Sequence, residues 1–207
     1  MNTREAYNNW SQQYDTNENK TRDLEAQALK SMLSDIPFDT VLEIGCGTGK
    51  NSVWLATKAT TITAVDLSEA MLAKAKAKIN SDALQFVQAD ITKDWQFAEK
   101  KYDLVTFSLV LEHIQDLNHI FHQTAKHLNK AGHVYIGELH PFKQYTGSKA
   151  RFETAQGTQV VDCYDHHISE FIQTAKKHGL AIADVNEFFD EGQTILPRIL
   201  TLLLKKL

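Results

Sequence analysis

The segment Val41-Leu42-Glu43-Ile44-Gly45-Cys46-Gly47-Thr48-Gly49-Lys50 restricts the possible folds of this chain more than any other. A strand-like run leads into glycines at every second position, and a helical pattern over residues 51–58 follows. Glycine permits a sharp turn and lets a ligand approach the main chain, because it has no Cβ. The spacing is G-x-G-x-G, unlike the G-x-G-x-x-G of dinucleotide-binding folds. The segment predicts a strand–turn–helix unit of an α/β fold, although a tight structural turn alone would also fit it.

Strand-like and helix-like segments alternate along the following residues. Runs rich in β-branched and aromatic residues predict five strands, at residues 40–44, 61–65, 84–87, 102–107 and 133–136. Helical patterns over residues 51–58, 68–79 and 117–128 separate them, with Ser68 as a helix start and Gly132 as a helix stop. This alternation predicts parallel βαβ units and therefore a doubly wound sheet.

Further elements precede and follow these units. Residues 22–33 predict an extra helix, and residues 168–177 predict a helix that ends at Gly179. The last apolar runs, residues 180–189 and 195–204, flank Asp190-Glu191-Gly192-Gln193 and predict an antiparallel hairpin. The expected fold class is α/β: a doubly wound, seven-stranded, mostly parallel sheet with one antiparallel strand. Residues 139–165 show no regular pattern.

Length and composition fit a single domain over residues 1–207, with 43% hydrophobic and 23% charged residues. We expect residues 1–36 to form N-terminal cap helices. The apolar runs are far shorter than the roughly 20 residues that cross a bilayer, and the polar start lacks a signal-peptide apolar region. We therefore expect a cytoplasmic protein with no membrane span. The net charge of -4 gives no basic footprint for a nucleic-acid partner.

Acidic residues stand beside the glycines and at the ends of the next two predicted strands. Asp66 ends the second strand about 20 residues beyond the glycines, where an acid can accept hydrogen bonds from ribose hydroxyls. It could instead cap the following helix, but Ser68 already suits that position. Asp90 ends the third strand, where an acid could meet an adenine edge. Glu43 is unusual in a buried strand unless its carboxylate orders the loop or meets a cation.

Together these segments resemble the successive motifs of class I S-adenosylmethionine-dependent methyltransferases. The resembling segments, within roughly residues 1–140, are Glu43–Gly49, Asp66–Ser68, Ala89–Ile91, Asp103–Val105 and Ser108–Ile114. Within the class, the chain is most similar to the small-molecule branch that includes ubiquinone and menaquinone biosynthesis methyltransferases. The resemblance implies a Rossmann-like methyltransferase fold, S-adenosyl-L-methionine as cofactor, S-adenosyl-L-homocysteine as product, and a small-molecule methyl acceptor.

The resemblance also implies which residues contact the cofactor. These are Trp10, Tyr14, Glu43, Gly45, Gly47, Asp66, Leu67, Met71, Asp90, Ile91, Ser108 and Leu109. The glycines would approach the methionine part and the acid after the second strand the ribose. The side chains that follow the second and third strands would surround the adenine, and those after the fourth would line the sulfonium side. The aromatic segment at residues 7–15 would close over the cofactor, or equally pack as an amphipathic helix.

Three residues are candidates for catalysis on the acceptor side. His140 leaves the fifth strand toward the ligand side of the sheet and is the preferred base. Arg151 could pair with an acceptor carboxylate or phosphate, and His113 lies in a stretch whose family role is mostly architectural. A structural histidine and a surface ion pair are the plain alternatives for the first two. No metal site is expected, because the histidines near residue 140 fit no zinc signature.

The sequence leaves three other functions open. A methyltransferase acting on RNA or protein is disfavoured because no basic patch or appended binding domain is present. A nicotinamide-dependent Rossmann oxidoreductase is disfavoured by the G-x-G-x-G spacing, and a catalytically silent cofactor-binding subunit by the full set of motifs. We expect residues 139–165 to form a lid or acceptor wall in a monomer or homodimer. Neither the acceptor nor the methylated O, N or C atom is identified.

Overall fold

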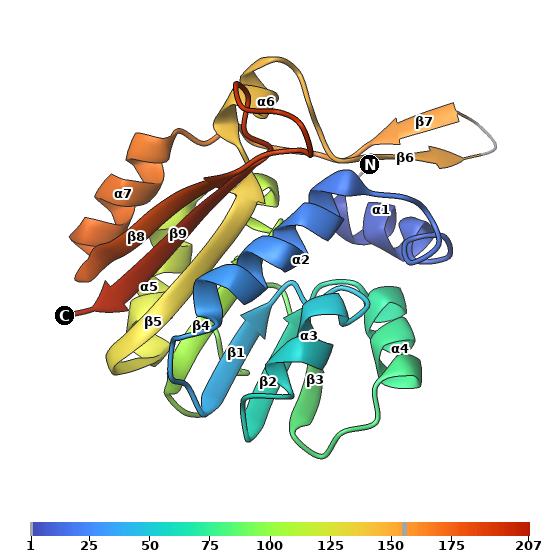
Figure 1. Cartoon of the computed structure of the whole chain (residues 1–207). Helices are drawn as coiled ribbons and strands as arrows, with labels where there is room; N and C mark the ends of the chain where they lie inside the picture. Colours follow the sequence, from blue (N-terminus) through green and yellow to red (C-terminus); the bar gives the residue numbers. More distant parts are fainter. Residues whose placement is uncertain (1, 155–156) are drawn as a thin grey trace.

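A seven-stranded sheet forms the centre of the computed structural model, which describes residues 2–154 and 157–207 (Figure 1). Its strands are β1 (Thr40–Ile44), β2 (Thr61–Asp66), β3 (Leu84–Gln88), β4 (Tyr102–Ser108), β5 (Leu128–Leu139), β8 (Leu180–Phe188) and β9 (Ile199–Lys206). They stand in the order β3-β2-β1-β4-β5-β9-β8. The first five pair in parallel, whereas β9 runs antiparallel to both of its neighbours. The predicted fold class is confirmed.

Helices cover both faces of the sheet. They are α1 (Thr3–Trp10), α2 (Lys20–Leu33), α3 (Lys50–Leu55), α4 (Glu69–Lys78), the 3-10 helix η1 (Leu111–His113), α5 (Leu117–His127), α6 (Pro141–Tyr145) and α7 (Ile168–Lys177). Figure 1 shows α2 and α3 before the sheet, with α5 and α7 behind it. Successive side chains of a strand point to opposite faces. Accordingly, Leu42 and Ile44 pack in the core cluster of α5 and α7, and Val41 packs with α2 and α3.

Gly132 does not end a helix, as the sequence pattern suggested. α5 ends at His127, and β5 begins at the next residue and includes Gly132. A Cβ on Gly132 would lie 3.0 Å from the carbonyl oxygens of Asn129 and Asp103. The glycine therefore permits a close approach between the main chains where β4 and β5 begin.

Residues 139–165 are more regular than the sequence indicated. They contain α6 and an antiparallel hairpin of β6 (Arg151–Thr154) and β7 (Gly157–Val160), which Figure 1 shows above α1. The connection from β8 to β9 also differs from the expected tight turn, because it extends over residues 189–198. Both segments lie at the end of the sheet where the parallel strands terminate. Among the described residues, no helix is long and apolar enough to cross a membrane.

The Asp103 carboxylate joins the starts of β1, β4 and β5 opposite that end. One oxygen accepts hydrogen bonds from the N–H and hydroxyl groups of Thr40, both at 2.9 Å, and from the N–H of Asp39 at 3.2 Å. The other accepts from Asn129 Nδ2 at 2.8 Å. Burial alone would raise the pKa of Asp103, but these hydrogen bonds lower it below its usual value. The ionised form is therefore the one that the folded chain stabilises.

Asp103→Ala should lower the free energy of unfolding by at least about 1.5–3 kcal/mol, the contribution of a hydrogen bond to a charged group. Because the folded pKa is depressed, this contribution is present at neutral pH. It should be lost as the pH falls below the usual aspartate value of about 4. Urea titrations between pH 7 and pH 3 would measure both effects, with the exposed Asp35→Ala as control. Equal stability losses for the two variants would contradict the assignment.

Candidate active site

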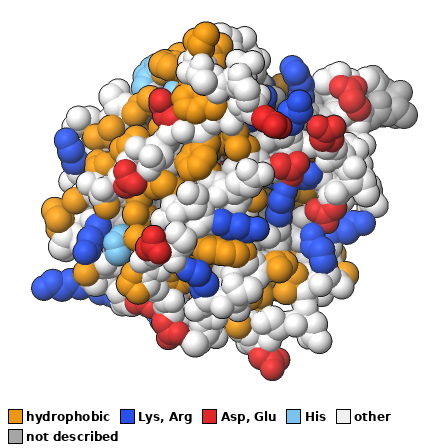
Figure 2. All heavy atoms as spheres, viewed as in Figure 1, with side chains coloured by type: hydrophobic (Ala, Val, Ile, Leu, Met, Phe, Trp, Pro, Cys, Tyr) orange, Lys and Arg blue, Asp and Glu red, His pale blue; other side chains and the backbone are white. Residues whose placement is uncertain are grey.

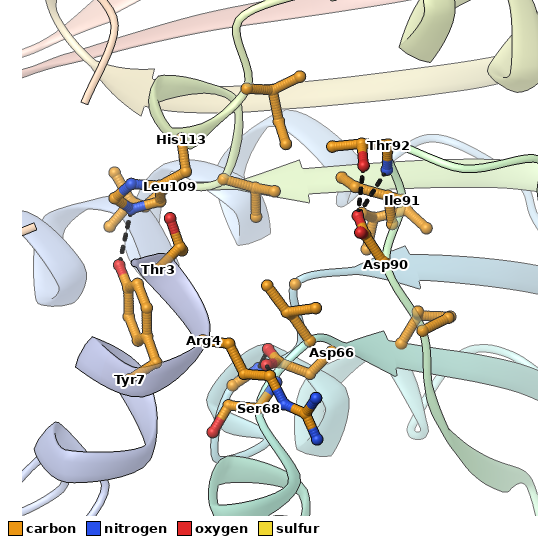
Figure 3. Close-up of a pocket in the computed structure, with 18 of the residues that line it drawn as sticks. Thr3, Arg4, Tyr7, Asp66, Ser68, Asp90, Ile91, Thr92, Leu109 and His113 are labelled. Carbon is orange, nitrogen blue, oxygen red and sulfur yellow. Dashed lines mark hydrogen bonds between the residues drawn. The ribbon is translucent and has the colours of Figure 1, made fainter. Parts of the chain in front are cut away.

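A cavity of about 480 Å³ opens at the carboxyl ends of β1, β2, β3 and β4, and α1 closes one side of it (Figure 3). The sheet runs from β1 toward β3 in one direction and toward β5 in the other. Ligands of doubly wound folds bind at such a reversal of strand order, outside the carboxyl ends of the strands. The predicted site residues that line the cavity are Tyr14, Gly45, Gly47, Asp66, Leu67, Asp90, Ile91, Ser108, Leu109 and His113.

The glycine turn after β1 forms the floor of the cavity. Gly45 and Gly47 have φ angles of +71° and +55°, in the left-handed region that favours glycine. A Cβ on Gly45 would lie 2.1 Å from Cγ2 of Val110, so this position has no room for a side chain. A Cβ on Gly47 would have no atom within 4 Å. Gly45 therefore serves packing, whereas Gly47 leaves space for a bound molecule.

Asp66 lies at the end of β2, between the glycine turn and α4. Its carboxylate accepts hydrogen bonds from the N–H groups of Gly47 and Ser68, each at 2.8 Å. Burial raises the pKa of Asp66 despite these hydrogen bonds. Ser68 caps α4 by accepting from the N–H of Met71 at 3.1 Å, so Asp66 is not the helix cap. Each carboxylate oxygen retains a lone pair, which a ligand hydroxyl could use.

Asp90 stands across the cavity at the end of β3. Figure 3 shows Asp90, Ile91 and Thr92 on one side, opposite Tyr7 and His113. The Asp90 carboxylate accepts hydrogen bonds from the N–H of Thr92 at 2.9 Å and from its hydroxyl at 2.7 Å. These local bonds hold the turn after β3, with Ile91 on the cavity wall. Thr92 was not predicted, although a threonine two residues after an aspartate is a recognisable turn signal.

The residue that follows β4, Leu109, has a strained backbone conformation. Leu109 has a φ angle of +57°, which is uncommon for a residue other than glycine. Its N–H donates to the carbonyl oxygen of Gly137 at 2.8 Å, which ties the strained residue to β5. Residues in such conformations cost about 1–3 kcal/mol and cluster at functional sites. The strain thus lies on the cavity wall, beside Ser108 and Val110.

Tyr7 and His113 meet on one wall of the cavity, although they are far apart in sequence. The Tyr7 hydroxyl lies 2.8 Å from His113 Nε2, and the two rings contact edge to face with centroids 5.3 Å apart. His113 Nδ1 lies 2.9 Å from the carbonyl oxygen of Asp162. Because a carbonyl only accepts, Nδ1 carries the proton and Nε2 presents a lone pair. The Tyr7 hydroxyl therefore donates to His113, consistent with burial raising its pKa.

Three predicted cofactor residues lie behind the cavity and do not line it. Met71 and Trp10 belong to the cluster that packs α1 against α4 and β6. Glu43 is 4% exposed and accepts a hydrogen bond from the Ser52 hydroxyl at 2.6 Å. Its carboxyl joins β1 to α3 across the glycine turn. The structure thus places Glu43 where it orders the loop, one of the two roles considered for it.

The structure places His140 away from the cavity. Its side chain is fully buried, Nδ1 accepts from the N–H of Phe142 at 3.2 Å, and Nε2 lies 2.9 Å from Glu187 of β8. Nε2 therefore carries the proton and donates to the carboxylate. Burial lowers the pKa of His140 more than Glu187 raises it. The expectation that His140 faces the ligand is wrong, because its ring caps α6 and links it to β8.

Arg151 lies on β6 and also does not line the cavity. It is exposed and borders a second cavity together with Trp10 and Tyr14. Of the three catalytic candidates, the structure brings only His113 to the cavity at the strand ends.

The described residues contain no group of three or more His, Cys, Asp or Glu side chains that could hold a metal ion. Burial raises the pKa of the Cys46 thiol, which suits a packed side chain.

Comparisons with known proteins agree with this geometry. Residues 42–136 match the family model described as a methyltransferase domain. The chain is 29% identical to the ubiquinone biosynthesis O-methyltransferase of Hydrogenovibrio crunogenus over 179 residues, 85% of this chain and 73% of that protein. It is 31% identical to the malonyl-[acyl-carrier protein] O-methyltransferase of Priestia megaterium over 62% of this chain, but spans only 48% of that protein.

A solved structure is similar to this chain over most of its length. The chain is 26% identical, with a TM-score of 0.75, to a Listeria monocytogenes protein provisionally assigned as an S-adenosylmethionine-dependent methyltransferase. The similarity covers 89% of this chain and 99% of that protein. The matched family model contains all the strand ends that form the cavity floor, from β1 to β4.

Gly45→Ala should destabilise the fold by at least about 1–3 kcal/mol, the cost of a strained backbone conformation, because its Cβ also meets Val110. Gly47→Ala carries only the backbone strain and should cost less. In the Gly45→Ala background, Val110→Ala should recover part of the loss by removing the overlapping methyl groups. Urea unfolding of the single and double variants measures this coupling. Strictly additive effects of Gly45→Ala and Val110→Ala would exclude the steric explanation.

Glu43→Gln should change how stability depends on pH. Burial raises the pKa of Glu43 to about 8, so the folded chain holds a proton that the unfolded chain releases near pH 4.3. Its contribution to stability is therefore full below pH 4.3 and declines as the pH rises toward 8. Glutamine stays neutral and should remove a slope of up to about 1.4 kcal/mol per pH unit. The measurement is the free energy of unfolding between pH 4 and pH 8 for wild type, Glu43→Gln and the exposed control Glu99→Gln. If the curves of wild type and Glu43→Gln run parallel across this range, the raised pKa of Glu43 is refuted.

Proposed function

Because this chain is a class I S-adenosylmethionine-dependent methyltransferase that resembles ubiquinone biosynthesis enzymes, we propose that it methylates a small-molecule metabolite, with His113 as the base. The observation that carries this proposal is the Tyr7–His113 pair on the wall of the cavity. It places Nε2 of His113, which accepts from the Tyr7 hydroxyl, next to the end of β4. The Hydrogenovibrio relative is named for methylation in ubiquinone biosynthesis, which supports a small-molecule acceptor.

The residues of the cavity fit S-adenosylmethionine. Gly47 leaves space where a side chain would stand, and the half-buried carboxylate of Asp66 lies beside it with unused lone pairs. We place the ribose hydroxyls on Asp66 and the adenine between Leu67 and Ile91. The methionine part would then lie over the glycine turn, and the sulfonium near Ser108 and Leu109 of β4. When bound, the cofactor supplies a methyl group that is activated toward a nucleophile.

On the acceptor side, His113 receives a proton, and the Tyr7 hydroxyl marks the position at Nε2 that the acceptor would take. An acceptor O–H or N–H group would replace the Tyr7 hydroxyl at Nε2 of His113. When the acceptor is methylated, its proton would pass to Nε2 of His113. The hydrogen bond from Nδ1 to the Asp162 carbonyl keeps the ring in the tautomer that this transfer needs. A base of this kind contributes about 10²–10⁴-fold, and alignment supplies the rest.

The surface charge also favours a small molecule over a nucleic acid. Figure 2 shows Lys and Arg side chains interspersed with Asp and Glu over the viewed face. A nucleic-acid footprint would gather basic side chains in a patch or stripe. The net charge of -4 agrees with this arrangement. A small metabolite has no such electrostatic requirement.

A labelled methyl donor incubated with a metabolite extract would test the acceptor class. We expect label in the small-molecule fraction and in neither the RNA nor the protein fraction. The His113→Gln protein should lose this transfer, while the exposed His122→Gln should retain it. Label confined to RNA or protein would refute the small-molecule proposal without affecting the methyltransferase assignment.

His113→Gln should lower turnover by about 10²–10⁴-fold and leave S-adenosylhomocysteine affinity nearly unchanged. The pH profile of the residual rate should differ from that of wild type. Tyr7→Phe should lower turnover less, because it removes the hydroxyl that the acceptor would replace and not the base. Single-turnover rates across pH, together with calorimetric titration of S-adenosylhomocysteine, would separate these effects. A turnover of His113→Gln equal to wild type would eliminate it as the base.

Asp66→Asn should weaken S-adenosylhomocysteine binding at least tenfold, because charge-assisted hydrogen bonds to the ribose are each worth about 1.5–3 kcal/mol. The amide keeps an oxygen acceptor for only one of the two main-chain N–H groups, so urea unfolding should accompany the titration to measure how far the fold itself is weakened. Calorimetric titration would measure the affinity, with Asp35→Asn as the exposed control. An unchanged affinity would restrict Asp66 to a structural role in the glycine turn.

A further inference from the structure

A second cavity, of about 470 Å³, lies between the connection from α1 to α2 and the β6–β7 hairpin. The residues that matter for its chemistry are Trp10, Tyr14, Arg22, Arg151 and Phe152. Two guanidinium groups and three aromatic rings thus border one hollow. Such a combination of an apolar border with a few polar groups is typical of small-molecule sites.

Arg22 is held in place before any ligand binds. Its Nη1 and Nη2 donate to the carbonyl oxygens of Tyr14 and Asn17, and its guanidinium lies over the Tyr14 ring, 4.9 Å from the centroid. The side chain is 13% exposed. Its Nε is buried without a hydrogen-bond partner among the described residues and lies 3.8 Å from the Asp23 carboxylate, which also pairs with Lys50. Each Nη also carries a second N–H that these carbonyl contacts do not use, so the fixed guanidinium can still donate to a ligand.

Arg151 supplies the second positive charge from β6. It is exposed and makes no ion pair with any residue of the ranges 2–154 and 157–207. Guanidinium groups bind carboxylates through two parallel N–H···O bonds. An arginine on the hairpin that faces a preformed arginine on α2 across a hollow thus offers a clamp for an oxyanion.

The aromatic residues form an apolar border beside this clamp. Trp10 and Phe152 stack with centroids 5.1 Å apart and planes 14° from parallel, and Tyr14 meets Trp10 edge to face. Trp10 and Phe152 are buried and cover one face of each other, so only a small part of each ring borders the cavity. A compact organic group could lie against this part while an attached carboxylate meets the arginines.

The charge balance of the cavity favours a carboxylate over a phosphate. Glu18 and Glu153 also line it, and Figure 2 shows acidic side chains near the basic ones in this part of the surface. Glu153 accepts a hydrogen bond from the Thr158 hydroxyl at 2.7 Å. The two arginines and two glutamates that line the cavity give it no net charge. A dianion would meet more repulsion from the glutamates than a single carboxylate held by a guanidinium group would, so a monoanionic carboxylate is favoured.

The position of the cavity indicates which molecule would bring the carboxylate. Tyr14 lines both this cavity and the cofactor cavity, so the two are neighbours. Its walls come from residues 10–22 and 151–153, entirely outside the region 42–136 that matches the methyltransferase family model. Methyltransferases share the methyl donor and differ in the acceptor. Walls built outside the shared region therefore suit the acceptor.

We propose that this second cavity is an acceptor subsite that binds a carboxylate between Arg22 and Arg151, with the adjoining compact organic group against Trp10 and Phe152. The proposal rests on the methyltransferase function proposed above and narrows its substrate class to organic acids. It gives Arg151 the role of an anion clamp at a place that the cofactor cavity does not include.

Calorimetric titration of the S-adenosylhomocysteine-loaded protein with benzoate tests this directly. Benzoate should bind and its neutral analogue benzamide should not. Arg151→Gln, at an exposed position, and Arg22→Lys, which keeps the charge but loses the fork, should each weaken benzoate binding at least fivefold. Lys176→Gln on α7 should leave it unchanged. No benzoate binding, or equal binding by the arginine variants, would overturn the proposal.

The carboxylate of the cofactor itself is the competing occupant, and a second titration separates it. S-adenosylhomocysteine carries that carboxylate, whereas 5′-methylthioadenosine lacks it. If the cavity serves the acceptor, Arg151→Gln and Arg22→Lys should bind both nucleosides as wild type does. Selective weakening of S-adenosylhomocysteine would assign the arginines to the cofactor and overturn the acceptor subsite. If the protein binds both nucleosides but does not bind benzoate, or if the arginine variants bind benzoate as wild type does, the acceptor subsite is overturned. The methyltransferase function proposed above would remain intact in that case.

Discussion

The Asp66 carboxylate is the contact on which the geometry of the cofactor cavity depends. Its hydrogen bonds to the N–H groups of Gly47 and Ser68 fix the turn after β1 against the start of α4. Because Asp66 is half-buried, water competes less with these bonds than it would at the surface. Gly45, which lies against Val110 without a Cβ, brings the end of β4 to the same place. Together these contacts align the ends of three strands around one hollow.

Local sequence was sufficient to predict the sheet and the floor of this cavity. The strands are short runs rich in β-branched and aromatic residues, and Gly45, Gly47, Asp66 and Asp90 stand at or just after their ends, so their positions follow from strand ends alone. The irregular segment at residues 139–165 was harder to predict. Its hairpin depends on Phe152 packing against Trp10, a contact that no local periodicity reveals.

The catalytic side could not be predicted in the same way, because side-chain partners there come from distant segments. His140 does leave β5 at the ligand end of the sheet, but Glu187 and the N–H of Phe142 turn its ring away. His113 gains its lone pair at the cavity from contacts with Tyr7 and Asp162, on two other parts of the chain. The hydrogen bonds of a histidine, more than its place on a strand, decide what its ring can do.

The position of β9 has a consequence for how the chain folds. This strand follows β8 in sequence, yet it pairs with β5 on one side and β8 on the other. Until residues 199–206 leave the ribosome, the edge of β5 has no strand to pair with and presents free N–H and C=O groups. Such unpaired edges are prone to association with other chains. The sheet therefore stays open at β5 until β9 is made, and during that interval this edge is the part of the sheet most exposed to such association.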